Sequence, residues 1–309
     1  MYPPLTLSAS GATDIGKKRT SNEDAVLVRD DLALYLVADG AGGHAAGEVA
    51  SRLALRSIEN FFDATLKKTH EKPEFDRLGI ARDARRLAAA VHKANRDVIE
   101  VAESSPEHRG MGTTLVAACF SPGSALLHVA HVGDSRCYRL RGEHLELLTQ
   151  DHSLATDILA ERPDIEDDVL DRIPANVVTR ALGMTRSLSL SLCSYAVVAG
   201  DKYLLSSDGL HALTHPDELA DILAFGKAPE ASVRRLIELA NAAGGTDNIS
   251  ALVIECQGGP DRARPTDETS RPADPELLIL GIEELDLGRI LEADTWQTLP
   301  ALRGGTGPR

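Results

Sequence analysis

Cysteine is scarce in this sequence, and no two cysteines lie close together. A C-x-x-C pair is the usual sign of a zinc or redox site, and a disulfide framework needs several cysteines in a short chain. Neither is therefore expected. Two of the cysteines lie in strand-like runs and are predicted to pack as small apolar side chains. The four residues are Cys119, Cys137, Cys193 and Cys256.

Basic residues and long apolar runs are also in short supply. Lys and Arg number 33 against 47 Asp and Glu, which gives a formal net charge of -14. This balance argues against nucleic-acid binding, which normally requires a basic face. No stretch approaches the length of a membrane span, and no basic segment followed by an apolar core begins the chain. We therefore expect a cytoplasmic protein that contacts neither nucleic acid nor membrane.

The composition that remains is that of an ordinary globular protein. The chain has 309 residues, of which 43% are hydrophobic, enough to bury a large core. Apolar residues at helical spacing predict helices at about 49–62 and 78–101. Strand-like runs lie before and after them, among them an apolar run at 32–38 that is predicted to be a buried strand. Two helices in succession, with no strand between them, count against a parallel βαβ fold. Residues before Ser10 are predicted to form at most a short edge strand.

The composition changes after Cys256. Residues 257–275 combine glycine, proline and many charges, as linkers do. Apolar residues return at 277–291, within a tail that spans 276–309. The sequence therefore predicts one folded domain at 1–256, with a loosely patterned stretch at 151–176 inside it.

Aspartates recur at the boundaries of the strand-like runs, most of them beside glycine. One Asp-Gly pair usually marks nothing more than a turn. Recurrence at several strand ends instead predicts that the carboxylates converge on one site. The aspartates are Asp24, Asp39, Asp134, Asp208 and Asp247.

Converging carboxylates would repel one another, and their pKa values would rise unless cations neutralised them. Mg²⁺ or Mn²⁺ is the natural partner, because oxygen ligands suit hard divalent cations and no metal-binding spacing of His or Cys accompanies the aspartates. His44 and His131 are expected to be packed or surface residues. Arg19 lies five residues before Asp24 and could hold a phosphate with its planar guanidinium. Cations beside a guanidinium suggest phosphoryl chemistry.

Seven short motifs give the sequence a resemblance to a known family. In order along residues 10–256, they resemble the motifs of the bacterial metal-dependent PPM (type 2C) protein serine/threonine phosphatases. The motifs are Arg19-Thr20-Ser21-Asn22-Glu23-Asp24-Ala25, Val37-Ala38-Asp39-Gly40-Ala41-Gly42-Gly43-His44, Gly110-Met111-Gly112-Thr113-Thr114, Val132-Gly133-Asp134-Ser135-Arg136, Asp151-His152-Ser153-Leu154, Ser206-Ser207-Asp208-Gly209-Leu210 and Gly245-Thr246-Asp247-Asn248-Ile249.

The resemblance implies a fold and an activity. The fold would be α+β, a four-layer αββα sandwich of two antiparallel sheets flanked by helix pairs, with residues 151–176 as a flap beside the site. The activity would be hydrolysis of phosphoserine and phosphothreonine by a metal-activated water, with no covalent intermediate. The cofactor would be two Mn²⁺ or Mg²⁺ ions, with a third, weaker site possible.

The resemblance also implies a role for each site residue. Asp39 would bridge the two metals, with Asp208 and Asp247 completing one and the Gly40 carbonyl binding the other. Asp24, with Glu23, would act through bound water. Asp134 would share the third metal with Asp208, and Arg19 would bind the substrate phosphate. Animal members carry a histidine at the position of Ala41, so no protein side chain is assigned as the general acid.

The expected partners are phosphorylated proteins, among them a Ser/Thr kinase whose action the enzyme would reverse, and the chain is expected to be a monomer. Two alternatives stay open at this point. One is a catalytically weak relative that serves as a regulatory binding module, although such a protein would be expected to have lost one of the five aspartates. The other is a hydrolase of small phosphomonoesters; a metallonuclease is disfavoured by the acidic charge.

Overall fold

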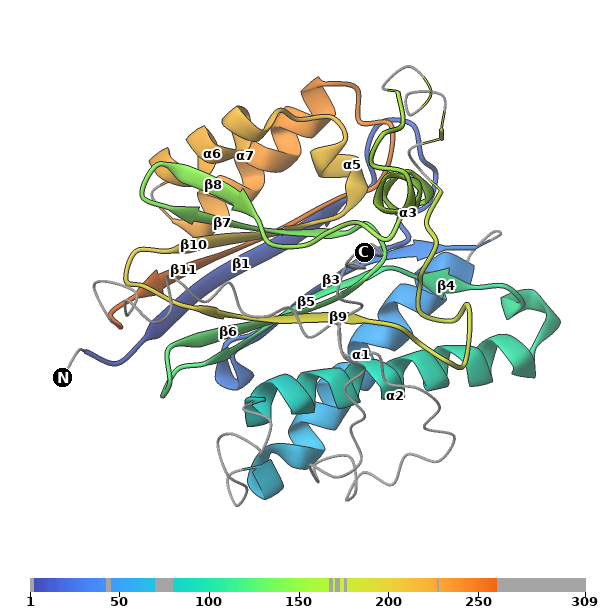
Figure 1. Cartoon of the computed structure of the whole chain (residues 1–309), viewed down its shortest axis with the longest axis horizontal. Helices are drawn as coiled ribbons and strands as arrows, with labels where there is room; N and C mark the ends of the chain where they lie inside the picture. The colour runs from blue at the N-terminus through green and yellow to red at the C-terminus, as the bar shows by residue number, and fades with distance from the viewer. Residues whose placement is uncertain are drawn as a thin grey trace, which may run out of the picture.

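The computed structural model describes residues 3–42, 46–69, 80–166, 169, 173–174, 177–226 and 228–259. These residues form two antiparallel β-sheets stacked face to face, with helices on both outer faces (Figure 1). This is the four-layer αββα sandwich that the resemblance implies, so the expected fold is confirmed.

The first sheet has five strands, and its first strand in the chain lies at one edge. Every neighbouring pair is antiparallel. Helices α6 (Pro216–Phe225) and α7 (Pro229–Ala242) cover its outer face (Figure 1). In spatial order the strands are β1 (Thr6–Asp14), β11 (Ile249–Gln257), β10 (Lys202–Ser206), β7 (Arg136–Arg141) and β8 (His144–Leu147).

The second sheet is also antiparallel, and the long helices α1 (Ala46–Thr69) and α2 (Arg82–Ser104) cover its outer face (Figure 1). Two short helices, α3 (Leu154–Glu161) and α5 (Asp208–His211), lie in the connections. The strands are β2 (Asp24–Arg29), β3 (Leu34–Ala41), β5 (Leu115–Ser121), β6 (Leu126–Val132) and β9 (Ser191–Ala196), with the two-residue β4 (Gly112–Thr113) paired to β3.

The layers follow from the alternation of side chains along each strand. On β3, Leu34 and Leu36 pack under α1 and α2, whereas Tyr35 and Val37 point into the space between the sheets. This is the two-residue period of a strand buried on both faces. β11 does the same between the inter-sheet core and the core under α6 and α7. Three apolar layers therefore hold the four structural layers together.

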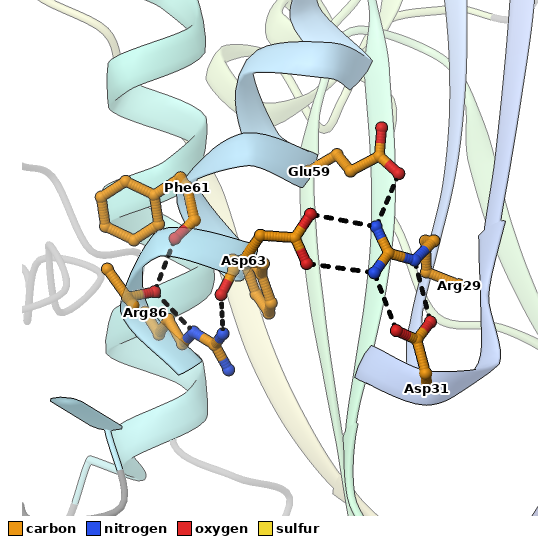
Figure 2. Close-up of polar contacts among 8 residues, drawn as sticks. Arg29, Asp31, Glu59, Phe61, Asp63 and Arg86 are labelled. Carbon is orange, nitrogen blue, oxygen red and sulfur yellow. Dashed lines mark hydrogen bonds and ion pairs between the residues drawn. The ribbon is translucent and has the colours of Figure 1, made fainter. Parts of the chain in front are cut away.

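Polar contacts tie α1 to its neighbours on both sides (Figure 2). The guanidinium of Arg29, at the end of β2, is bound by Asp31 and by Glu59 and Asp63 of α1, at distances of 2.7 to 3.0 Å. On the α2 side, Arg86 lies over the ring of Phe62, 4.1 Å from its centroid, and donates to the Phe62 carbonyl. A guanidinium suits this task because its planar fork can serve several acceptors at once.

Most of the predicted elements are present, but some differ in extent and two were missed. β1 extends to Asp14, well beyond the short edge strand predicted before Ser10. The prediction missed this extension because the serines, alanines and glycine of β1 show no apolar alternation. β4 and α5 were not predicted, since two and four residues are too short to show a period. Cys119 and Cys137 are free and buried, as expected.

The predicted domain boundary at 256 stays a prediction. β11 runs to Gln257 and the described chain to Gly259. The tail from residue 260, His44 and part of the predicted flap lie outside the described residues. Among the described helices, none is both long and apolar enough to cross a membrane.

Candidate active site

Five aspartates from both sheets meet at one end of the sandwich. Asp24 begins β2, and Asp39, near the end of β3, is its direct partner across the ladder. Asp208 begins α5 just after β10, and Asp247 lies in the turn before β11. Asp134 lies in the crossing from β6 to β7. The structure thus brings together all five aspartates that the sequence singled out.

Asp24 and Asp39 are held close together although both are acids. Asp24 is 3% exposed, and its Oδ2 accepts hydrogen bonds from Ser207 and Ser250, each at 2.7 Å. Burial raises the pKa of Asp24 to about 6, and the two serine hydroxyls oppose that rise. Burial, with the charges of Asp24 and Asp208, raises the pKa of Asp39 well above its ordinary value. Two carboxyls that face each other in a dry site repel each other when both are ionised, and this raises their pKa values.

Asp208 and Asp134 extend the same cluster. Burial, followed by the charge of Asp247, raises the pKa of Asp208, while a hydrogen bond with Asp39 lowers it. Burial, followed by the charges of Asp208 and Asp151, raises the pKa of Asp134 to about 6. The cluster is therefore a region of strong negative potential that favours cations.

Arg19 lies at the rim of this cluster. Its guanidinium donates to Asp247 Oδ2 at 2.6 Å, and the two side chains are 54% and 33% exposed. That hydrogen bond raises the pKa of Arg19, with further support from the charges of Glu23 and Asp39. Burial also raises the pKa of Glu23, which ends the loop that carries Arg19 and directly precedes Asp24 of β2. An accessible guanidinium beside a carboxylate cluster is suited to binding an anion such as phosphate.

Asn248 holds the loop that carries Arg19. Its side-chain oxygen accepts from the backbone N–H of Glu23, and its NH₂ group donates to the carbonyls of Ile15 and Ser21. The backbone N–H of Lys17 also donates to the Gly245 carbonyl at 2.7 Å. The loop is thereby fixed against the turn that presents Asp247.

At two positions beside the aspartates, only glycine lets neighbouring backbone segments approach closely. A Cβ on Gly40 would lie 2.1 Å from the Gly47 carbonyl oxygen, and one on Gly209 would lie 2.0 Å from that of Asn248. Real Cβ atoms do not approach backbone oxygens so closely, so no larger residue fits without moving the main chain. The Asp39-Gly40 and Asp208-Gly209 pairs therefore serve close packing beside the carboxylates.

Several residues that position the aspartates had no predicted role. Ser207, Ser250 and Asn248 lie beside predicted residues, but hydroxyl and amide side chains are common in turns, so their type alone carries little signal. Thr114 is similar: its hydroxyl accepts from the Asp39 backbone N–H at 3.2 Å and shares a 2.7 Å hydrogen bond with Ser135. Ser207, Asn248 and Thr114 lie inside the seven family motifs, which was the sequence signal that could have identified them, whereas Ser250 lies outside the motifs.

Two buried histidines, His131 and His152, pack next to the segment that carries Asp134. His131 is buried, stacks on His152 with ring centroids 4.6 Å apart, and contacts the Gln150 carbonyl. His152 Nδ1 accepts from the backbone N–H of Gly133, which precedes Asp134. The prediction that His131 is a packed residue is therefore confirmed.

The donor atoms of the cluster fit hard divalent cations. Asp24 Oδ1 and Asp208 Oδ1 are buried oxygens with no hydrogen-bond partner, and a buried unpaired carboxylate oxygen is costly unless a cation satisfies it. Within the described residues, no three His, Cys, Asp or Glu side chains are gathered tightly enough to hold a metal ion. One of the five carboxylates, Asp247, is paired with Arg19 at 2.6 Å. The chemistry of the site fits a metal, and Arg19 competes for one of its ligands.

A two-sheet sandwich with a carboxylate cluster at one end is suited to hydrolysis assisted by hard cations. Comparison with known proteins agrees. The sequence profile of the protein phosphatase 2C family matches residues 13–242. The chain belongs to this family.

The alignments with three relatives cover nearly the whole length of each relative. Serine/threonine phosphatase stp of Listeria welshimeri is 34% identical over 253 residues, which are 81% of this chain and 96% of the relative. The PPM Ser-Thr phosphatase MsPP of Mycobacterium smegmatis, solved in complex with cacodylate, superposes with a TM-score of 0.66 at 36% identity, over 80% of this chain and 97% of its own. The catalytic domain of serine threonine protein phosphatase PstP, solved with two manganese ions, gives 0.68 at 33% identity, over 82% and 99%.

Proposed function

We propose that this chain is a metal-dependent protein serine/threonine phosphatase that hydrolyses phosphoserine and phosphothreonine. The observation that carries the proposal is the convergence of Asp24, Asp39, Asp134, Asp208 and Asp247 beside Arg19. The similarity to serine/threonine phosphatases over most of the chain supports it. All five carboxylates are present, whereas a relative reduced to a binding module would be expected to lack some of them.

The site residues would divide the work as follows. Asp39 would bridge two Mn²⁺ or Mg²⁺ ions, Asp208 and Asp247 would complete one, and the Gly40 carbonyl would bind the other. Asp24, oriented by Ser207 and Ser250, would act with Glu23 through bound water. Asp134 and Asp208 would share a third, weaker site. The related PstP structure, solved with two manganese ions, supports a two-metal site.

When bound, the cations would supply a water that can attack phosphorus near neutral pH and would offset the negative charge of the phosphoryl group. Arg19 would leave Asp247 and bind two phosphoryl oxygens with its planar fork, which orients the ester for in-line attack. The loop bonds of Asn248 hold Arg19 where this exchange of partners needs only side-chain movement. Ala41 carries no proton to give the leaving oxygen, so no side chain is assigned that step.

Phosphoprotein substrates follow from the proposed activity, and the names of the relatives support them. A Ser/Thr kinase as partner, a monomeric state and a cytoplasmic location stay predictions.

The test is release of phosphate from a phosphothreonine peptide with Mn²⁺, compared with EDTA, an aryl phosphate and a phosphodiester. We expect release from the peptide and the aryl phosphate only, and loss of both with EDTA and in Asp39→Asn. Cleavage of the aryl phosphate without the peptide would favour a small-phosphoester hydrolase. No release from any substrate by folded, Mn²⁺-loaded protein would favour the binding module.

A further inference from the structure

One edge of the first sheet, formed by β1, borders a groove that the reaction does not use. β1 is paired with β11 on one side only, so its other edge presents unpaired backbone groups among the described residues. Beside it lies a groove of about 590 Å³ between β1 and α7. Exposed strand edges readily accept another strand, and proteins generally cover or blunt them.

The groove exists because the outward side chains of β1 are small. Leu7 and Ala9 of β1 pack inward, into the core between the sheets. The alternate positions face α7, and among them Ser10 and Ala12 line the groove. Val233 and Ile237 of α7 form its apolar wall. Apolar side chains of an added strand would therefore find space and apolar contact here.

Charges of both signs line the groove, and its two cations can bind the acidic flanks of an apolar strand. Lys17 and Arg234 line it, and within the described chain neither makes an ion pair. Asp14, Glu230 and Glu238 line it too. Asp14 Oδ1 already accepts from the Gly16 backbone N–H and from the Asn241 side chain, and Glu238 lies 3.5 Å from Arg235. Lys17 and Arg234 are therefore the charges in the described lining that remain for acidic groups of an added strand.

The sequence holds one segment of this character. Residues 277–282 read Leu-Leu-Ile-Leu-Gly-Ile, with no charge and no proline, and are flanked by Glu276 and by Glu283-Glu284. Five strongly apolar residues and one glycine, with no charge among them, tend to pair as a strand and are adhesive when exposed. Nothing in the proposed reaction needs them.

The geometry of the chain allows this segment to reach the groove. The backbone N–H of Gly259 donates to the Pro3 carbonyl at 2.8 Å, so the chain leaves the fold beside the start of β1. The groove lies along the second half of β1, about 26 Å further on at ~3.3 Å per residue. Residues 260–276 can span roughly 56 Å when extended. A tethered segment also binds at a high effective concentration.

We propose that residues 277–282 add to the free edge of β1 in the same molecule, as a sixth strand of the first sheet, with alternate apolar side chains in the groove beside Ala12 and Ile237. This is addition of a strand to an exposed sheet edge, in which backbone hydrogen bonds give affinity and alternate side chains give specificity. The occupant is the chain's own tail rather than a second copy.

The test is hydrogen exchange of the full-length protein, which is independent of catalysis. In the wild type, the amides of β1 and of residues 277–282 should be protected together. In Leu278→Asp/Leu280→Asp, exchange of both should quicken by roughly tenfold or more, since the edge opens. Leu302→Asp, an equivalent change outside the segment, is the control and should leave both unchanged.

A groove variant completes the test. Ala12→Glu places bulk and negative charge at an exposed position facing the segment, so the tail should exchange faster although it is unaltered. Combined with the tail substitutions it should add nothing further to tail exchange. Unchanged exchange of β1 in Leu278→Asp/Leu280→Asp would overturn the proposal. Protection that grows with protein concentration would overturn it in favour of a second copy.

Discussion

Arg19 takes part in two competing interactions, and its removal should affect them in opposite directions. In the structure its guanidinium is bonded to Asp247 at 2.6 Å. The proposed function requires Asp247 to bind a cation and Arg19 to bind phosphate. Arg19→Ala should therefore weaken catalysis and at the same time strengthen the binding of Mn²⁺.

The magnitudes follow from the two contacts. A hydrogen bond to a charged group contributes about 1.5 to 3 kcal/mol, so kcat/KM should fall roughly 10- to 150-fold. The ion pair is largely open to solvent, and such pairs are worth up to about 1 kcal/mol. The Mn²⁺ affinity of Arg19→Ala should accordingly rise by up to about fivefold. Arg19→Lys should recover only part of kcat/KM, because an ammonium lacks the planar fork.

Two measurements separate these effects. Steady-state hydrolysis of an aryl phosphate at saturating Mn²⁺ gives kcat/KM, and calorimetric titration of the metal-free protein with Mn²⁺ gives the affinity. Lys18→Ala is the matched control, since it removes one exposed positive charge from the same loop without breaking the pair. An unchanged kcat/KM in Arg19→Ala would return Arg19 to the role of a surface charge. Equal Mn²⁺ affinity in Arg19→Ala and Lys18→Ala would refute the competition for Asp247.

Three further predictions concern other parts of the molecule. Asp39→Asn should lower turnover of an aryl phosphate by roughly 100-fold or more without unfolding the protein, because the neutral amide removes the negative charge that two cations would share. Extra Mn²⁺ should not restore turnover, and near-normal turnover would contradict the bridging role of Asp39. A chain ending at Gln257 should keep its fold and its aryl-phosphatase activity, as measured by melting curves and kinetics, whereas an unfolded or inactive short form would place the tail in the core. Burial lowers the pKa of His92 to about 4, so the unfolded chain, with a pKa of about 6.5, takes up this proton first as the pH falls. Stability should be full above pH ~6.5 and drop by about 2 kcal/mol at pH 5 from this residue. His92→Leu should therefore show a shallower acid decline in melting temperature, and an identical decline would refute the assignment.

The sequence predicted the parts of the fold that have a clear period. Residues 32–38 read as a buried strand because apolar side chains fill both faces, and β3 occupies most of that range. Its start was misplaced: Ala33 has a left-handed backbone at φ 49° and closes a short 3-10 turn. Apolar character alone cannot distinguish a turn residue from the first residue of a strand.

The site was predictable to the extent that its chemistry rests on charge. A single carboxylate at a strand end is ordinary in a turn, but recurrence at five strand ends was informative, and the structure brings all five together. The supports of Asp24 were not predictable, because Ser207 and Ser250 are ordinary residues whose importance comes only from where the chain places them. The Arg19–Asp247 pair was missed for a related reason, since it joins residues 228 positions apart.

The candidate site lies across the boundary between the two sheets, and this gives it a mechanical property. Asp24 and Asp39 belong to the second sheet, whereas Asp208 and Asp247 are attached to strands of the first. The spacing of the carboxylates is thus set by how far the sheets stand apart and how they slide. That spacing is maintained by inter-sheet side chains such as Phe120, whose ring packs edge-on against Tyr35 and Tyr203. The packing of the inter-sheet core therefore sets the distance between the carboxylates of the two sheets. Substitution of an aromatic ring such as that of Phe120 should change this distance, although the ring does not touch the carboxylates.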